Sequence, residues 1–153
     1  MTYRDAIYKE LYIEIEAIKK AIVQLDYAFE KCTSIGLKNE YSAEELIMWE
    51  GFTARHSRLS DILTQKVLNN FIIIETLKKG TINDKANFAV AQGWIDSIDE
   101  FRKLRNIRNF IAHEYIHEDV NIVFESVTNS YSLLKKFAEK IILFYESNPI
   151  YKL

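Results

Sequence analysis

Residues that break helices or make tight turns are scarce in this sequence. Its 153 residues include four glycines and one proline. All-β sandwiches and barrels need many turns of the kind that glycine and proline supply, so the composition argues against both architectures. Apolar residues make up 48% of the chain, which also argues against a disordered protein. The composition therefore favours a helical protein with few loops.

The sequence contains a single cysteine, Cys32. One cysteine excludes a disulfide within the chain and fits a reducing compartment. We expect Cys32 to be a buried structural residue, because free cysteines are more often buried in this way than reactive as nucleophiles.

Long apolar runs and an excess of charge of one sign are also missing. No stretch approaches the roughly 18 consecutive apolar residues of a membrane helix. The first ten residues, MTYRDAIYKE, are charged where a secretory signal would be apolar. We therefore expect a cytoplasmic protein without a membrane contact. The formal net charge is −2, so any nucleic-acid site has to be local.

The usual signatures of metal and cofactor sites are absent from the sequence. No dense cluster of histidine, cysteine and aspartate has the spacing of metal ligands, and no glycine-rich loop is suited to phosphate binding. We expect neither a metal nor a cofactor.

Apolar residues recur every three or four positions along most of the chain, which predicts amphipathic helices. The predicted helices are 4–32, closed by Gly36; 42–79; 84–92, stopped by Gly93; 98–115; and 119 to a point before Pro149. Four long helices and a short one predict an all-α, antiparallel up-and-down four-helix bundle with one extra short helix, as a single domain over 1–153. Nine tyrosines, nine phenylalanines and two tryptophans exceed the needs of one small core, so we expect a homodimer.

Three details of this prediction have two explanations each. Gly51, inside the predicted second helix, either permits a close helix contact or marks a later helix start. The apolar run from Phe71 to Ile74 belongs to the core or to an interface, with the core as the default. Trp49 and Trp94 are core residues or a base-stacking platform.

The sequence RNFIAHEY, from Arg108 to Tyr115, places an arginine, an amide, an imidazole and a phenol on the predicted fourth helix. On a helical wheel Arg108 falls among apolar residues, where a guanidinium needs an anionic partner. The adjoining flank is polar and basic and contains Arg102, Arg105, Asn109 and His113.

Arg108 and His113 are five residues apart, which on an ideal helix separates them by roughly 140° in rotation and about 7.5 Å in height. One helix cannot point both side chains at one atom. The spacing therefore favours a cleft between two copies of the chain over a pocket within one subunit.

An arginine and a histidine together suit one kind of chemistry. A histidine of near-neutral pKa transfers protons, and an arginine holds a phosphate and stabilises its developing charge. This pair suits metal-independent cleavage of RNA, in which the 2′-hydroxyl is the nucleophile, and Tyr115 beside it could stack on a base or be modified. On composition and spacing alone, however, structural roles are commoner, since the helix dipole by itself stabilises His113 near a C-terminus.

The stretch RNFIAHEY resembles the Arg-x4-His-x-Tyr motif of the HEPN superfamily, and is most similar to its HepT-like branch. The similarity extends from Phe101 to Val123 and includes the order of the long helices. It implies an all-helical homodimer whose two motifs meet in an interface cleft, acting as a metal-independent ribonuclease toxin. Arg108 and His113 would then be the catalytic pair, supported by Asn109. A minimal nucleotidyltransferase antitoxin would adenylylate Tyr115.

Other basic residues are candidate RNA contacts. Arg102 and Arg105 precede the motif, and Arg55 and Arg58 lie on the second helix, although solvated side chains are the commoner explanation for the last two. His56 falls on the apolar stripe of that helix. We expect it to be a hydrogen-bonded core residue and not a second catalytic base.

Two other functions remain compatible with the sequence. The same bundle could serve as a non-catalytic substrate-binding or antitoxin-type subunit of a nucleotidyltransferase, although a scaffold has no need of an intact Arg108 and His113 pair. An unrelated helical bundle could also carry the motif by chance.

Overall fold

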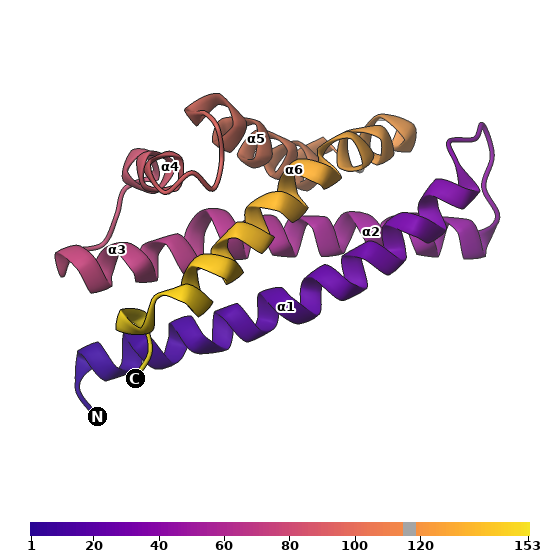
Figure 1. Ribbon diagram of the computed structural model, residues 1–153. Coiled ribbons are helices and arrows are strands. Elements are labelled where there is room, and N and C mark those ends of the chain that lie inside the picture. Colours follow the sequence, from indigo (N-terminus) through magenta and orange to yellow (C-terminus); the bar gives the residue numbers. More distant parts are fainter. Residues whose placement is uncertain (115–118) are drawn as a thin grey trace.

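Helices form almost all of the computed structural model, which describes residues 1–114 and 119–153 (Figure 1). The elements are α1 (Tyr3–Ile35), α2 (Ala43–Asp61), a π-helical segment (Ile62–Val67), α3 (Leu68–Thr76), α4 (Ile82–Ala91), α5 (Ile98–Glu114), α6 (Val120–Ser147) and a 3-10 turn (Pro149–Tyr151). Because α2, the π-helical segment and α3 follow without a break, they make one long helix. The prediction of an all-α protein with four long helices and a short one is confirmed over these residues.

The first two helices start within a residue of the predicted positions, and α1 ends three residues later than predicted, at Ile35. Ser42 caps α2 and forms a capping box with Glu45. Gly36 follows α1 with a φ of 74°, and its N–H donates to the carbonyl of Cys32. Only glycine adopts this backbone conformation readily, so Gly36 terminates α1 as predicted.

Two further helix boundaries differ from the prediction. α3 stops at Thr76 because Leu77 takes a left-handed conformation, with φ of 63°. α4 begins two residues early, because Thr81 and Asp84 form a capping box that the sequence analysis missed. α5 begins at Ile98, as predicted, and Ser97 accepts a hydrogen bond from the Glu100 N–H, at 3.2 Å. The Glu100 carboxylate, however, accepts from the N–H of Asp96.

Neighbouring long helices run antiparallel (Figure 1). Along α1, Glu14 meets Asn70 of α3, and Gln24 meets Arg55 of α2, so the order of contacts reverses. The same reversal relates α1 to α6, where the α1 residues Lys19 and Asp26 pair with Glu146 and Lys135 respectively. α5 packs on α2 and α6, and α4 lies against α3 and α5. The up-and-down order of the helices is therefore as predicted.

Aromatic side chains fill the core. Trp49 is 2% exposed and stacks on Phe124, with ring centroids 4.7 Å apart. Trp94 is 3% exposed and lies 5.3 Å from the Phe71 ring. Both tryptophans are core residues, and the alternative of a base-stacking platform is wrong.

The structure also decides between the alternatives for the apolar run from Phe71 to Ile74 and for Gly51. Phe71, Ile72 and Ile73 are buried within the subunit, which confirms the core assignment of this run. α2 begins well before Gly51, and a Cβ built on Gly51 would meet nothing within 4 Å, so both explanations of this glycine are wrong. Cys32 is buried as expected, and burial raises the pKa of its thiol to about 12.

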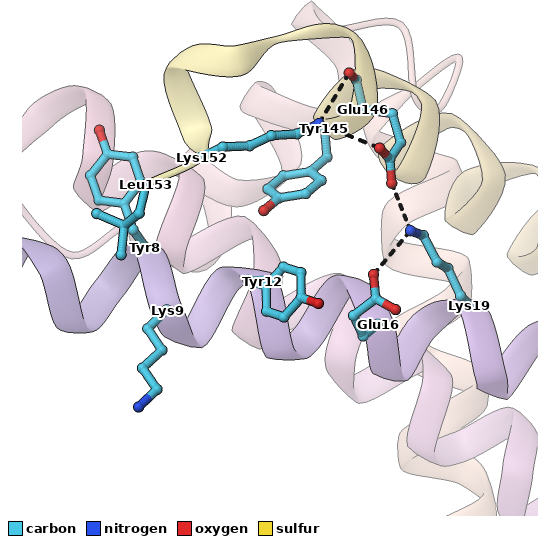
Figure 2. Close-up of a pocket in the computed structure, with 9 residues that line it drawn as sticks. All are labelled: Tyr8, Lys9, Tyr12, Glu16, Lys19, Tyr145, Glu146, Lys152 and Leu153. Atoms are coloured by element: carbon cyan, nitrogen blue, oxygen red, sulfur yellow. Dashed lines mark hydrogen bonds and ion pairs between the residues drawn. The ribbon is translucent and has the colours of Figure 1, made fainter.

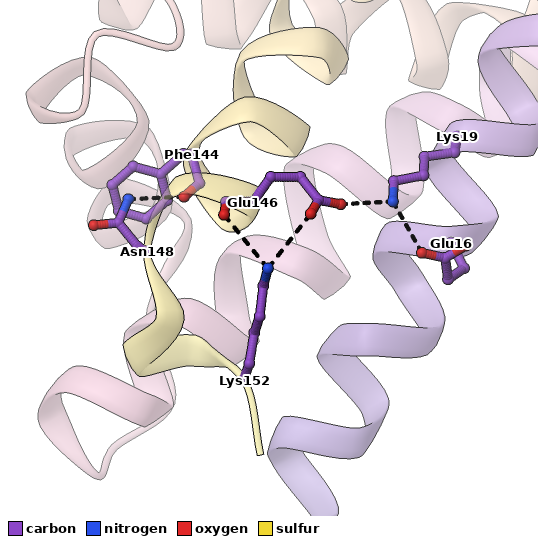
Figure 3. Close-up of polar contacts among 6 residues, drawn as sticks. All are labelled: Glu16, Lys19, Phe144, Glu146, Asn148 and Lys152. Atoms are coloured by element: carbon purple, nitrogen blue, oxygen red, sulfur yellow. Dashed lines mark hydrogen bonds and ion pairs between the residues drawn. The ribbon is translucent and has the colours of Figure 1, made fainter.

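The C-terminal residues fold back on α1. They enclose a depression of about 540 Å³ between α1 and α6, with Tyr8, Tyr12 and Tyr145 around it (Figure 2). Lys19 lies between Glu16 and Glu146, with Nζ to carboxylate distances of 3.0 and 2.6 Å (Figure 3). In the described part of the chain, no helix is both long and apolar enough to cross a membrane.

Candidate active site

Helix α5 positions the residues of the predicted site. Phe101 and Leu104 are 1% and 0% exposed, and they fix one side of α5 against the core. Arg108 follows Leu104 by one helical turn on the same side and is half-buried. The position of Arg108 therefore follows from the apolar residues that anchor its helix.

Arg108 is held by an ion pair with Asp61, the last residue of α2. The Nε–H of Arg108 donates to both carboxylate oxygens of Asp61, at 2.9 and 3.1 Å. The anionic partner that the sequence analysis required for this arginine is therefore present. Asp61 was not predicted as this partner, although it is the only acidic residue between Glu50 and Glu75 in the sequence.

The ion pair leaves part of the guanidinium available. Asp61 engages Nε, and no described residue accepts a hydrogen bond from the two terminal Nη nitrogens of Arg108. The side chains of Arg108 and Asp61 are 33% and 31% exposed, so water reaches the pair. A guanidinium held in this way can present two donors to a phosphate.

A π-helical segment begins directly after Asp61. In this region the Thr64 hydroxyl donates to the carbonyl of Ser60, at 2.7 Å. Short π-helical insertions are rare and recur at functional sites. The widened helix thus lies next to the carboxylate that holds Arg108.

His113 lies on a different side of α5 from Arg108. It is exposed in the last turn of the helix, whereas Arg108 faces α2. The expectation that one helix cannot bring these two side chains together is confirmed. His113 continues an exposed polar stripe of α5, with members spaced by four, three and four residues: Arg102, Asn106, Asn109 and His113.

Arg102, Arg105 and Asn109 border a depression of about 110 Å³ between α4 and α5. Arg55 and Arg58 are not part of this group. Arg55 donates a hydrogen bond to Gln24 on α1, and Arg58 is exposed, with its Nε 3.4 Å from the carbonyl of Ala54.

Tyr115 and His117 lie outside the described residues. The structure therefore gives no position for the tyrosine that the motif resemblance singles out.

His56 is a core residue, as predicted. It is 0% exposed, and its Nε2 lies 2.8 Å from the Ser130 hydroxyl. That hydroxyl donates to the carbonyl of Ser126, so we assign the proton to Nε2 of a neutral imidazole that donates to Ser130. Burial lowers the pKa of His56 to about 4. A buried histidine that stays neutral is a poor candidate for proton transfer at the surface.

No group of three or more potential metal ligands occurs among residues 1–114 and 119–153. The chemistry that the described residues on α5 offer is charge stabilisation by arginine and proton transfer by histidine.

A family model described as ribonuclease HepT-like matches residues 71–141 of the chain. The resemblance to the HepT-like family is confirmed. The matched stretch runs from α3 into α6 and contains all of α4 and α5. No curated protein and no solved structure matches the chain.

The HepT-like stretch includes Arg108, Asn109 and His113, but Asp61 precedes it. The residue that orients Arg108 thus comes from a part of the chain that the family match does not cover. The family's description as ribonucleases agrees with the kind of chemistry that arginine and histidine on α5 can perform.

Proposed function

We propose that this protein is a metal-independent endoribonuclease toxin, active as a homodimer and paired with a nucleotidyltransferase antitoxin in the cytoplasm. The observation that carries the proposal is the half-buried Arg108, which Asp61 holds by Nε while the terminal nitrogens reach solvent. The HepT-like match, described as a ribonuclease family, supports the same function.

The proposed reaction is attack of an RNA 2′-hydroxyl on the adjacent phosphorus, with loss of the 5′-oxygen of the next nucleotide. His113 takes the proton of the 2′-hydroxyl as general base. Arg108 binds the non-bridging phosphate oxygens and stabilises the charge that develops on them, and the Asn109 amide donates a further hydrogen bond. The departing 5′-oxygen takes a proton from the protonated His113 of the second copy or from water.

A second copy of the chain is part of the proposal because Arg108 and His113 lie on different sides of α5. The groove between α5 and α6 supports this idea, since it carries apolar side chains next to the motif. Ile107 and Phe110 are half-buried there, and Ile122 is 46% exposed. A two-fold interface over this face would bring two motifs into one cleft.

The roles of the other predicted residues follow from this arrangement. Arg102 and Arg105 on α5, and Arg55 and Arg58 on α2, would contact RNA phosphates. The partner nucleotidyltransferase would silence the toxin by adenylylating Tyr115.

The test is RNA cleavage by the purified protein in excess chelator. We expect the unmodified protein to cleave, and His113→Ala and Arg108→Ala each to lower kcat/KM by about 100-fold or more. Lys136→Ala, which removes an exposed charge on α6, is the control and should cleave normally. Equal cleavage by all four proteins, or none by any of them, would count against the proposal.

One observation favours a second function, that of a non-catalytic subunit of a nucleotidyltransferase. The ion pair between Arg108 and Asp61 could stabilise the α2–α5 contact without any catalysis. Expression of the chain alone separates the two functions. A ribonuclease toxin arrests growth and His113→Ala relieves the arrest, whereas a scaffold leaves growth unchanged.

A further inference from the structure

The depression between α4 and α5 is lined by basic and amide side chains without any carboxylate. Arg102, Arg105 and Asn109 of α5 face Asn83 of α4 across it, and buried apolar residues that include Phe101 form its floor. A hollow of about 110 Å³ with arginine and amide donors around an apolar floor is suited to a small anion.

Lys85 of α4 lines the neighbouring depression of about 550 Å³ and not this one, but its charge is close enough to that of Arg105 to be affected by it. Both side chains are half-buried. Burial lowers the pKa of Lys85, and the nearby charge of Arg105 lowers it further. Within residues 1–114 and 119–153, the ion pairs of α5 join Arg102 to Asp99 and Arg108 to Asp61, and none joins Lys85 or Arg105 to a carboxylate.

Two neighbouring, half-buried positive charges that form no ion pair with a carboxylate destabilise the folded chain. The depression at the α1–α6 end shows the alternative arrangement. There Lys19 contacts two carboxylates and Lys152 lies 3.4 Å from Glu146 (Figures 2 and 3). The lysines there already hold anionic partners from the chain itself, whereas Lys85 and Arg105 would gain most from an anion in solution.

We propose that Arg105, Arg102, Asn83 and Asn109 around the α4–α5 depression form a binding site for a phosphate group, with Lys85 of α4 as a further cation beside it. The phosphate belongs either to an RNA backbone or to a small phosphorylated molecule. Arg105 precedes His113 by eight residues, which is about 12 Å along the helix axis. An RNA that leaves the site of cleavage along the polar stripe of α5 would reach this subsite. The assignment to RNA rests on the proposed ribonuclease function, and the phosphate site itself does not.

The first test is thermal unfolding in inorganic phosphate and in chloride at equal ionic strength. A ligand that binds the folded state raises the unfolding temperature. We expect phosphate to raise the Tm of the unmodified protein above its value in chloride. In Lys85→Gln this increment should largely disappear, although the variant itself should have a slightly higher Tm in chloride, because one of two adjacent like charges is gone.

Lys136→Gln removes an exposed charge on α6 and is the matched control, so it should keep the full phosphate increment. A merely structural role of Lys85 predicts a lower Tm in chloride instead. That outcome, an increment that is equal in Lys85→Gln and the unmodified protein, or no increment in either of them, would overturn the proposal.

The second test identifies the carrier of the phosphate. A single-stranded 2′-O-methyl RNA oligonucleotide lacks the nucleophile, so its binding can be measured whether or not the protein is a ribonuclease. We expect Lys85→Gln to weaken binding by about five- to tenfold and to reduce the slope of log K against log salt by about 0.7, the loss of one phosphate contact.

If Lys85→Gln abolishes the phosphate increment but binds the oligonucleotide as well as the unmodified protein does, the site takes small phosphorylated molecules. If neither measurement changes, the proposal is wrong. Because neither measurement involves cleavage, an inactive His113 site would leave both results interpretable.

Discussion

Cations at the α1–α6 depression and cations beside α4 and α5 are held in different ways. At the α1–α6 end, Lys19 lies 2.6 Å from Glu146, and Lys152 contacts the same carboxylate and lies over the Tyr145 ring. Beside α4 and α5, Lys85 and Arg105 have no such partner among the described residues. The first arrangement attaches the C-terminal residues to α1. The second leaves charge available to a ligand, so the pairing of a cation is a better guide to its role than its exposure.

Arg108 combines features of both regions. Its Nε is paired with a carboxylate, as in the α1–α6 depression, and its terminal nitrogens have no acceptor in the described chain, as in the α4–α5 depression. A residue held in this way is oriented by one contact and can still bind a ligand by others.

Outside the motif on α5, the largest expected effect comes from removing the carboxylate that orients Arg108. Asp61→Asn keeps the shape of the side chain and removes its charge, so Arg108 loses its charge-assisted hydrogen bonds. We expect kcat/KM for RNA cleavage to fall by about 10- to 100-fold, because small misplacements of a catalytic group have effects of this size.

The control for this prediction is Glu16→Gln, which removes a carboxylate from a lysine at the α1–α6 end. It should cleave RNA at the normal rate. Unchanged cleavage by Asp61→Asn would show that Arg108 needs no orientation from α2.

Asp61 also shows where prediction from sequence stops. The helices follow from apolar spacing and capping residues such as Ser42 and Gly36, which act within a few residues of the sequence. The need of Arg108 for an anion also follows from its place among apolar residues. Its partner is 47 positions away on another helix, and only the packing of α5 on α2 selects it.

The proximity of Lys85 to Arg105 could not be predicted for the same reason. Each lies on its own amphipathic helix, and their distance depends on how α4 packs against α5. The start of α4 could have been predicted from the sequence, since Thr81 and Asp84 have the spacing of a capping box with aspartate in place of glutamate.

In the core, removal of a hydrogen-bond acceptor should lower the stability of the folded protein. Ser130→Ala leaves the Nε2–H of His56 without an acceptor, and the Nδ1 atom of this buried ring already lacks a hydrogen-bond partner. We expect the free energy of unfolding in urea to fall by about 1–3 kcal/mol. Ser132→Ala, at an exposed position of the same helix, should change it by less than about 0.5 kcal/mol. Equal effects of the two changes would mean that the hydrogen bond to His56 contributes nothing.

Burial shifts the pKa of Glu14 toward the neutral form, as it does that of Lys85. Both line one depression of about 550 Å³, yet Glu14 is hydrogen-bonded to Asn70 and not to a lysine. Burial raises the pKa of Glu14 to about 7, with a smaller rise from Glu10, against opposing effects of Asn70 and Lys66. The folded protein therefore keeps a proton that the unfolded chain releases near pH 4.5, and the stability that this proton confers is lost as the pH rises through about 7.

Glu14→Gln should remove this pH dependence, because a glutamine oxygen can still accept from Asn70. We expect the variant to exceed the unmodified protein in unfolding free energy by on the order of 1 kcal/mol at about pH 8, and by much less at about pH 5. The difference between the two proteins at each pH cancels the contribution of His56. A difference that stays constant from pH 5 to pH 8 would contradict the raised pKa.

The smallest expected effects are changes in Tm when a charge is removed from either region. The sign of each change tests the comparison between the two regions. Glu146→Gln removes the partner of Lys19 and Lys152, so it should lower the Tm slightly at about 0.1 M NaCl and hardly at all at about 1 M, where the Debye length is about 3 Å. Lys85→Gln should raise the Tm slightly at the lower salt concentration, and this gain should also fade at the higher one. If both substitutions lowered the Tm, Lys85 would have a stabilising partner after all, and the distinction between the two regions would fail.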